Sequence, residues 1–416
     1  MKIGLFGVSR CGKDYLINKV LKSAINLKHI RGSTTLEKFA KIKFNLPFAA
    51  LNNDEKTALR ITFTEEAKKE ESRVGNIIVD GHYSFPNENG DYDIVFTDAD
   101  RTLYDVFIYM NTEASAVLKN QLRPNYMRKV HQYSEDEIVA WQEFEIDQMR
   151  KICKSLGTEL LVIDGDKDCE AEFIAELIYS PKNFQPRALA KKAISGHRSL
   201  LECAKTVVIT DCDRTLAIND TTLSFCDIVG INTQVIRENF RGEYYSIFQF
   251  YQVNKYYSDI LPDAHYYNAC DYAAETAMMN ELLISDIKSS AGEFITLAIT
   301  SGILDIWKRI QGIQHFADIV IGKGRANDGG IYVSTQVKQA IVEELKAMGK
   351  MVIAIGDSPI DIGMLEAADK GYLIAMQKLS SGVKSYLTGT PDTKIMQLKY
   401  SSFKYDKITE AESIWQ

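Results

Sequence analysis

Residues 206–215 read TVVITDCDRT, an apolar run that ends in two carboxylates two positions apart, and this stretch decides the fold of the C-terminal half. The run predicts a buried strand. Asp211 and Asp213 then emerge at its carboxyl end, where ligands bind in open α/β sheets. One carboxylate can attack phosphorus, and the other can protonate a leaving oxygen and then activate water. Taken alone, the motif also fits an acidic turn after a strand.

Two later stretches supply groups that suit a phosphoryl group. The next predicted strand, 294–299, runs into Thr300, Ser301 and a glycine, whose hydroxyl and backbone N–H groups can hold phosphate oxygens. We assign Ser301 to this role, with Thr300 as the alternative. Lys338 follows a predicted helix N-cap, and its ammonium can neutralise phosphoryl charge and keep a nucleophilic carboxylate ionised.

A fourth stretch adds two more carboxylates at a strand end. The apolar run 351–355 leads into GDSPID, which contains Asp357 and Asp361. Mg²⁺ takes oxygen ligands only, so the sequence predicts a Mg²⁺ site formed by carboxylates from two strand ends, Asp211 and Asp213 on one and Asp357 and Asp361 on the other.

These four stretches, in this order and each after its own strand, resemble the haloacid dehalogenase superfamily over residues 205–400, and its phosphoserine-phosphatase-like branch in particular. The resemblance implies an aspartyl-phosphate mechanism, with Asp211 as nucleophile and Asp213 as general acid and base. It also implies that Ser301 binds phosphate, that Lys338 is the motif lysine, and that Asp357 holds Mg²⁺ with support from Asp361. A second acid at position 213 favours a phosphatase over a dehalogenase.

The insert at about 217–290 is rich in helix formers and tyrosine, and it resembles the helical cap of such enzymes. A cap excludes water and selects the substrate. Its aromatic side chains either form the core of a small helical unit or stack on a base of the substrate. The sequence leaves both interpretations open.

The N-terminal stretch 7–14, GVSRCGKD, fits the phosphate-binding pattern GxxxxGK and departs from it at the last position. It follows an apolar strand and opens a helix, so Gly7, Gly12 and the helix N-terminus can bind phosphate, and Lys13 can reach the β- and γ-phosphates of ATP or GTP. Asp14 replaces the usual Ser or Thr. It can still hold Mg²⁺, but it adds negative charge beside a triphosphate.

Residues 1–180 resemble small P-loop kinases of the adenylate kinase type. Asp80 ends the predicted strand 76–80, at the place of their catalytic or metal-positioning acid. Arg31 follows the first helix, where these kinases contact the acceptor. Arg123 and Arg128 fall where they carry a lid whose arginines stabilise the transferring phosphoryl group. For the three arginines, solvated surface charge is an equal alternative.

The predicted fold is α/β, with two Rossmann-like parallel-sheet domains, because short apolar runs alternate with helical stretches in both halves. Residues 1–180 form a P-loop domain, 181–204 form a linker with some helix, and 205–416 form the phosphatase domain with its cap.

The composition and net charge of the chain argue against several classes of protein. Seven Cys without a CxxC pair and six scattered His argue against a disulfide framework and a structural zinc site. A net charge of −7 weakens the case for a duplex nucleic-acid binder without excluding a nucleic-acid end as substrate. No apolar run is long enough to cross a bilayer, and the N-terminus does not resemble a signal peptide, so we expect a cytoplasmic protein.

Three functions remain open. The pair of domains can phosphorylate and dephosphorylate a small metabolite or nucleotide, which we prefer. It can act instead as a polynucleotide 5′-kinase and 3′-phosphatase, as the domain order of phage end-repair enzymes suggests. In the third, the P-loop domain senses a nucleotide without turning it over, which the unusual Asp14 would explain.

Overall fold

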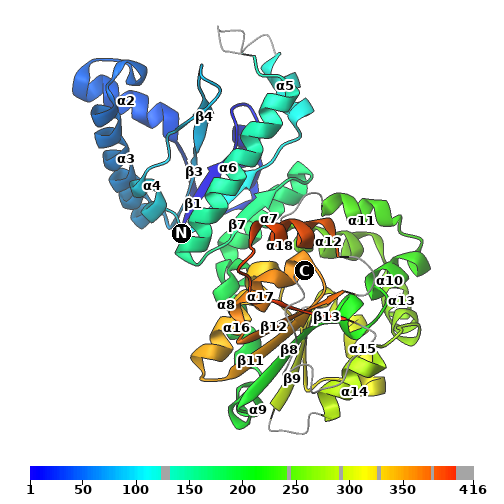
Figure 1. Cartoon of the computed structure of the whole chain (residues 1–416). Helices are drawn as coiled ribbons and strands as arrows, with labels where there is room; N and C mark the ends of the chain where they lie inside the picture. Colours follow the sequence, from blue (N-terminus) through cyan, green and yellow to red (C-terminus); the bar gives the residue numbers. More distant parts are fainter. Residues whose placement is uncertain (123–131, 241–244, 290–293, 326–328, 376–378, 400–416) are drawn as a thin grey trace. The chain divides into compact units, whose positions relative to one another are not determined.

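The computed structural model describes residues 1–122, 132–240, 245–289, 294–325, 329–375 and 379–399 of the 416-residue chain. They fall into two compact units, Met1–Pro181 and Lys182–Gln416. Each unit is built on a parallel sheet with helices between the strands (Figure 1). The predicted α/β class with two parallel sheets is confirmed. No helix in the described parts of the chain is both long and apolar enough to span a bilayer.

The N-terminal sheet has five parallel strands in the order β2-β3-β1-β6-β7. Its strands are β1 (Lys2–Phe6), β2 (Leu27–Arg31), β3 (Asn76–Asp80), β6 (Val106–Met110) and β7 (Leu160–Ile163), and a separate hairpin joins β4 (Ser84–Pro86) to β5 (Tyr92–Ile94). Four strands form from continuous apolar runs because a parallel sheet is covered on both faces. The fifth, β2, is an edge strand with a mixed sequence, LKHIR. Strand β1 lies where the order of connections reverses, so the loop after it is at a switch point.

Two long helices of the N-terminal unit, α3 and α6, begin at capping boxes. Asn52 with Glu55, and Ser134 with Glu137, each form a reciprocal capping box in which both backbone N–H groups are bonded. The helices are α1 (Lys13–Ser23), α2 (Gly32–Phe44), η1 (Phe48–Ala50), α3 (Asn53–Val74), α4 (Asp98–Leu103), α5 (Ala114–Gln121), α6 (Glu135–Leu156) and α7 (Lys167–Tyr179).

The C-terminal sheet has six parallel strands in the order β10-β9-β8-β11-β12-β13. Its strands are β8 (Thr206–Asp211), β9 (Phe294–Ile303), β10 (Ile319–Lys323), β11 (Met351–Gly356), β12 (Lys370–Ala375) and β13 (Met396–Lys399). Because β8 is central and has β9 on one side and β11 on the other, the carboxyl ends of these three strands meet at a switch point. This edge carries the carboxylates that the sequence singled out.

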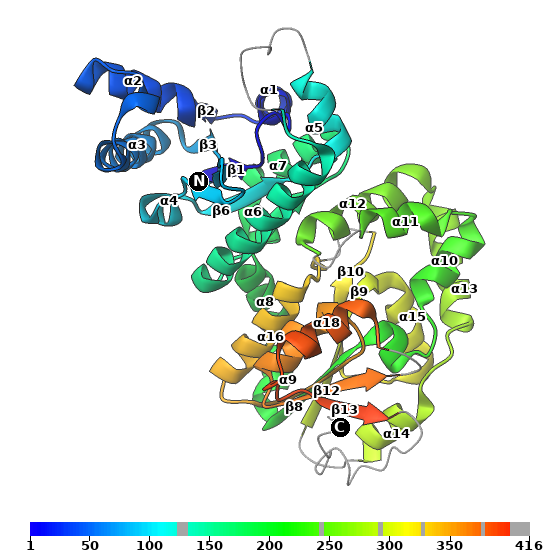
Figure 2. The same ribbon diagram turned by 45° about the horizontal axis from the view of Figure 1, so that its top comes forward.

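In the described residues of the insert expected to be a cap, five α-helices lie between η4 and β9. They are α10 (Thr221–Val229), α11 (Thr233–Asn239), α12 (Ile247–Ile260), α13 (Asp263–Glu275) and α14 (Glu281–Ser289). Figures 1 and 2 both show α10 to α13 grouped beside the sheet. Their apolar core includes Phe225, Tyr257 and Tyr266, so part of the aromatic content of this insert is structural.

The remaining helices of the C-terminal unit lie before β8 or between strands of the sheet. They are α8 (Pro186–Ser195), α9 (Arg198–Cys203), η4 (Cys212–Leu216), α15 (Leu304–Gln314), α16 (Thr335–Ala347), η5 (Pro359–Asp361), α17 (Ile362–Ala367) and α18 (Ser381–Gly389), and η3 (Pro181–Phe184) precedes them. The segment 181–204, which we expected to be a linker with some helix, is almost wholly helical. Its helix α8 packs closely against α16, so this segment is part of the C-terminal unit.

Candidate active site

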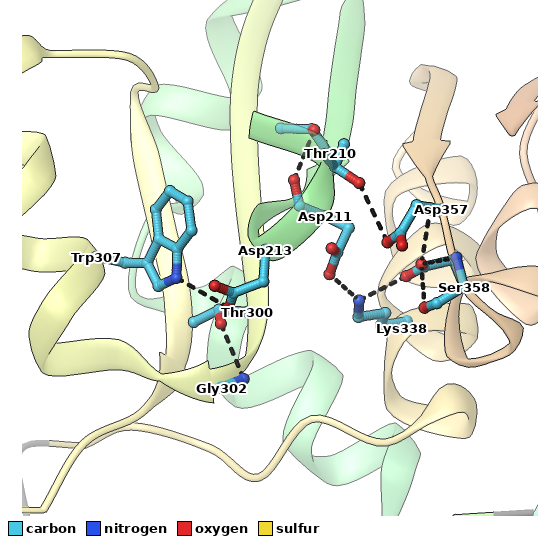
Figure 3. Close-up of polar contacts among 11 residues, drawn as sticks. Thr210, Asp211, Asp213, Thr300, Gly302, Trp307, Lys338, Asp357 and Ser358 are labelled. Atoms are coloured by element: carbon cyan, nitrogen blue, oxygen red, sulfur yellow. Dashed lines mark hydrogen bonds and ion pairs between the residues drawn. The ribbon is translucent and has the colours of Figure 1, made fainter. Parts of the chain in front are cut away.

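The C-terminal site is built around Asp211, the last residue of the central strand β8. Asp211 is 6 % exposed, and its Oδ1 accepts a hydrogen bond of 2.5 Å from Lys338 Nζ. Its second carboxylate oxygen has no hydrogen-bond partner among the described residues, and Asp211 lines a large cavity. One oxygen is therefore fixed, and the other is free to react (Figure 3).

Lys338 lies in the first turns of α16, which begins at an N-cap where Ser334 Oγ accepts the Val337 N–H. The Lys338 side chain is fully buried, and its Nζ also donates to Asp361 Oδ1 at 2.6 Å. Burial opposes its charge, but the contacts with Asp211 and Asp361 outweigh this and raise its pKa, so the amine stays protonated. A buried cation thus links the ends of two strands.

Asp361 is fully buried, and its bonds use both of its oxygens. Oδ1 accepts from Lys338, and Oδ2 accepts from the N–H groups of Asp357 and Ser358 and from Ser358 Oγ at 2.7–3.1 Å. These bonds fix the turn that follows β11. Asp361 is placed to orient Lys338 and Asp357 rather than to react.

Three carboxylates, from Asp211, Asp357 and Asp361, have oxygens within 4.8 Å of one another. Burial, and then the charge of Asp361, raise the pKa of Asp357 to about 7. Burial likewise raises the pKa of Asp211 against the opposing effect of Lys338. One lysine does not neutralise three carboxylates, so a divalent cation with oxygen ligands fits this donor set.

Asp213 does not belong to that cluster of carboxylates, and its expected role in holding a metal stays a prediction. The backbone turns at Arg214, which has a positive φ of 60°, and directs Asp213 away from Asp357 (Figure 3). Its Oδ1 accepts from both the N–H and the hydroxyl of Thr221, the first residue of α10, and its Oδ2 accepts from Trp307 Nε1 at 3.3 Å.

The surroundings of Asp213 suit a group that carries a proton. Burial, and then the charge of Asp220, raise its pKa to about 6, against the hydrogen bonds from Thr221 and Trp307. A carboxyl group with such a pKa is a usable acid and base near neutral pH.

Two buried hydroxyls in the site have no hydrogen-bond partner in the described parts of the chain, Ser301 Oγ and Thr222 Oγ1. Both residues line the cavity. Thr300 differs, because its Oγ1 accepts the Gly302 N–H at 2.9 Å. A buried polar group without a partner is costly, so both free hydroxyls are placed to meet a ligand, and Ser301 fits the phosphate better than Thr300. No sequence motif identified Thr222, which is the second residue of α10.

A cavity of about 930 Å³ lies over the carboxylates, between the sheet edge and the helices α11 and α12. On the helix side its wall is largely apolar. That wall includes Ile236, Phe240, Tyr245, Phe250, Val253 and Tyr257, with Arg237 and Asn254 as polar members. The aromatic residues of the insert therefore form both a core and one wall of the site.

In the N-terminal unit, the loop after β1 contains two glycines with positive φ. Gly7 and Gly12 have φ of 147° and 104°, which side-chain-bearing residues rarely adopt. A Cβ at Gly7 would also lie 2.9 Å from Cys11 Sγ and from the Met110 carbonyl oxygen. Lys13 is buried and turned onto the loop, where its Nζ donates to the Gly7 carbonyl at 2.7 Å. The loop and α1 together present backbone N–H groups and one cation.

Asp80 lies at the carboxyl end of β3, next to β1. Its Oδ1 accepts the Gly32 N–H at 2.9 Å, and His29 Nε2 is 3.6 Å from its Oδ2. Asp14, in the first turn of α1, is exposed, and its Oδ1 is 3.3 Å from Arg31 Nε. The structure thus brings Asp14, Arg31 and Asp80 to the same edge. Arg123 and Arg128 lie outside the described residues.

Residues 335–394 match the family described as haloacid dehalogenase-like hydrolase, and this match contains Lys338, Asp357 and Asp361. A search of curated proteins finds no match.

Several solved structures are similar to parts of the chain. A phospho-aspartyl intermediate analogue of phosphoserine phosphatase is 17% identical, with 50% of this chain and 100% of that chain covered and a TM-score of 0.36. Phosphoserine phosphatase from T. onnurineus is 15% identical, with coverage of 51% and 98% and a TM-score of 0.36. Shikimate kinase from Bacteroides thetaiotaomicron is 13% identical, with coverage of 43% and 98% and a TM-score of 0.25. Such identities and scores do not indicate a shared substrate.

Proposed function

We propose that the C-terminal unit hydrolyses the phosphomonoester of a nucleotide or a metabolite of similar size through an aspartyl-phosphate on Asp211. The observation that carries this proposal is the convergence of Asp211, Lys338 and Asp357 with the unpartnered hydroxyl of Ser301 at one sheet edge. These groups come from β8, α16, the loop after β11, and β9. Asp211 and Asp361 are buried and Asp357 is half-buried, and charges of one sign grouped away from water are costly unless they are paired or bind a metal.

The free oxygen of Asp211 attacks phosphorus, while Lys338 holds the other oxygen and keeps the carboxylate ionised. Asp213 donates its proton to the leaving oxygen, so the alcohol departs neutral. Asp213 then takes a proton from water, which attacks the aspartyl-phosphate and releases phosphate and Asp211. Ser301 Oγ donates to a phosphate oxygen throughout, which satisfies its buried hydroxyl.

Asp211 and Asp357 would hold Mg²⁺, with Asp361 positioning Asp357 through its N–H group. The bound cation would supply charge neutralisation for the phosphoryl group. The uncompensated carboxylate charge of the cluster supports this assignment.

The size and lining of the cavity support a substrate larger than a phosphorylated amino acid. A volume of about 930 Å³ lies at the upper end of the range for small-molecule sites, roughly 300–1,000 Å³. Phe240 and Phe250 offer aromatic faces, and Arg237 offers a charge at the same wall. Stacking on a base is worth roughly 1–3 kcal/mol, so a nucleoside phosphate fits this wall well.

We further propose that the N-terminal unit is an ATP-dependent kinase for a small metabolite or nucleotide, with GTP as the alternative phosphate donor. The conformation of Gly7 and Gly12, the position of Lys13 and the placement of Asp80 beside the loop support this proposal. The exposed pair of Asp14 and Arg31 favours a second candidate, a unit that binds the nucleotide without transferring phosphate.

The nucleophile assignment is tested with Asp211→Asn and p-nitrophenyl phosphate as substrate. We expect hydrolysis to disappear while the circular dichroism spectrum stays unchanged. Asp259→Asn is the matched control, because Asp259 is an exposed carboxylate paired with Lys255. Wild-type turnover in Asp211→Asn would remove Asp211 from the mechanism.

A substrate panel tests the choice of function. Mononucleotides, phospho-amino acids and 3′-phosphorylated oligonucleotides are offered to the phosphatase, and nucleosides, nucleotides and 5′-OH oligonucleotides to the kinase with labelled ATP. We expect the fastest turnover with mononucleotides. Turnover confined to oligonucleotide ends would instead indicate a nucleic-acid end-repair enzyme, and nucleotide binding without transfer would indicate the sensor.

A further inference from the structure

A second group of side chains that could hold a metal ion belongs to the N-terminal unit. Asp14, His29 and Asp80 each offer one ligand atom, and these atoms lie within 4.8 Å of one another. They come from the start of α1 and from the neighbouring strands β2 and β3. Among the described residues, this group and the phosphatase carboxylates are the two clusters of this kind.

His29 is the member that points to a ligand. Its side chain is 10 % exposed, and its Nε2 has no hydrogen-bond partner among the described residues. The nearest carboxylate oxygen, Asp80 Oδ2, is 3.6 Å away, beyond hydrogen-bond distance. A buried ring nitrogen without a partner is costly, and a cation between His29 and Asp80 would satisfy both atoms.

The surrounding contacts hold the group in a geometry suitable for binding. Asp80 Oδ1 accepts the Gly32 N–H at 2.9 Å, which leaves Oδ2 turned toward His29. Such outer contacts orient the ligands of metal sites. Asp14 is 64 % exposed, and so is much of Arg31, its ion-pair partner at 3.3 Å. An exposed pair of this kind is weak, so it does not prevent Asp14 from turning to a cation.

We propose that Asp14, His29 and Asp80 bind a divalent transition-metal ion, of the Mn²⁺ or Zn²⁺ kind, in preference to Mg²⁺. Imidazole is a poor ligand for Mg²⁺ and a good one for transition metals, whereas carboxylates serve both. Asp14 directly follows Lys13, so the ion faces the phosphate-binding loop. Any role of this ion toward a bound triphosphate depends on the nucleotide function proposed above. The binding of the ion by these three side chains does not depend on that function.

The test uses the full chain, Mn²⁺ as the probe and no nucleotide. Electron paramagnetic resonance measures free Mn²⁺ during a titration, and pulsed experiments detect ¹⁴N coupled to bound Mn²⁺. We expect two Mn²⁺ equivalents in the wild type, with ¹⁴N modulation from one of them. Asp357→Asn should lose the equivalent without nitrogen and keep the one with it. His29→Gln should lose the ¹⁴N signal and weaken that site by at least about tenfold.

His265→Gln is the matched control, because His265 is exposed on α13 and belongs to no cluster of ligands among the described residues. It should leave both equivalents and the ¹⁴N modulation unchanged. Asp14→Asn provides a second test, since the exposed Asp14 can change without disturbing the core, and it should also weaken the nitrogen-bearing site. Mn²⁺ bound to the wild type without ¹⁴N modulation, whether as one equivalent or two, would overturn the proposal. A single equivalent that shows ¹⁴N modulation and survives Asp357→Asn would support it and would count instead against the Mg²⁺ site proposed for the phosphatase.

Discussion

Replacing Lys338 with methionine should destabilise the C-terminal unit strongly, because it removes the cation between two buried carboxylates. Asp211 and Asp361 lie within 4.8 Å of each other, and Lys338 is 2.5 and 2.6 Å from them. At an effective dielectric constant of about 20, two charges that far apart repel by about 3 kcal/mol. Removing one member of a buried ion pair costs roughly 3–5 kcal/mol. We expect the free energy of unfolding to fall by that amount at about pH 8 in Mg²⁺-free buffer.

Hydrogen–deuterium exchange of the amides in β8 and β11 reports the stability of this unit separately from the N-terminal one. The double variant Lys338→Met with Asp361→Asn removes one of the two repelling charges, so it should recover part of the lost stability. Lys346→Met is the matched control on the same helix. Lys346 pairs with Asp369 at the surface, and its loss should cost no more than about 1 kcal/mol.

Two results would contradict the electrostatic argument. One is a decrease in the free energy of unfolding of less than about 1 kcal/mol in Lys338→Met, comparable to that of the Lys346→Met control. The other is a double variant less stable than Lys338→Met, because that would mean Asp361 contributes through packing rather than through its charge.

Three further changes test other parts of the structure. Thr222→Val keeps the shape of the side chain but removes its unpartnered hydroxyl. The kcat/KM of the phosphatase should fall by about 10- to 100-fold, which is the value of a hydrogen bond to a charged group. An unchanged kcat/KM would show that Thr222 does not contact the substrate. Burial raises the pKa of Glu170 from 4.5 to about 7, in spite of Lys167. The folded state therefore holds this proton more tightly than the unfolded chain, and stability present below about pH 4.5 decreases by about 3 kcal/mol as the pH rises through about 7. The free energy of unfolding, measured by urea denaturation over this pH range, should show this decrease in the wild type and lack it in Glu170→Gln. Identical pH profiles in the two proteins would refute the raised pKa of Glu170. Lys13→Ala should weaken ATP binding at least about tenfold in calorimetry while p-nitrophenyl phosphate hydrolysis stays the same, and unaltered ATP affinity would exclude Lys13 from phosphate binding.

The sequence predicts those parts of the fold whose local pattern matches their final burial. The apolar runs at 76–80 and 351–355 become β3 and β11 because central parallel strands are buried on both faces. Two strands at sheet edges, β2 and β13, were not predicted. β2 contains Lys28 and His29, and β13 reads MQLK, so neither shows the continuous apolar run that identifies a buried strand.

In the candidate site, the order of motifs along the chain predicts which residues lie close together. It does not predict the direction in which each side chain points. Carboxyl ends of neighbouring parallel strands meet at one edge, so the grouping of Asp211 with Asp357 follows from sequence alone. The direction of Asp213 does not, because it depends on the backbone turn at Arg214. Thr222 belongs to no motif, and the absence of a hydrogen-bond partner in the described structure is what identifies it. His29 is identified by the same absence together with its place beside Asp14 and Asp80.

A crystal structure with Mg²⁺ and beryllofluoride, which mimics a phosphoryl group on a carboxylate, tests the central claim most directly. We predict beryllium bonded to the oxygen of Asp211 that Lys338 does not hold, fluorine within hydrogen-bond distance of Ser301 Oγ and Lys338 Nζ, and Mg²⁺ bound by Asp211 and Asp357. Beryllofluoride bound away from Asp211, or Mg²⁺ bound without Asp211 and Asp357, would contradict the account.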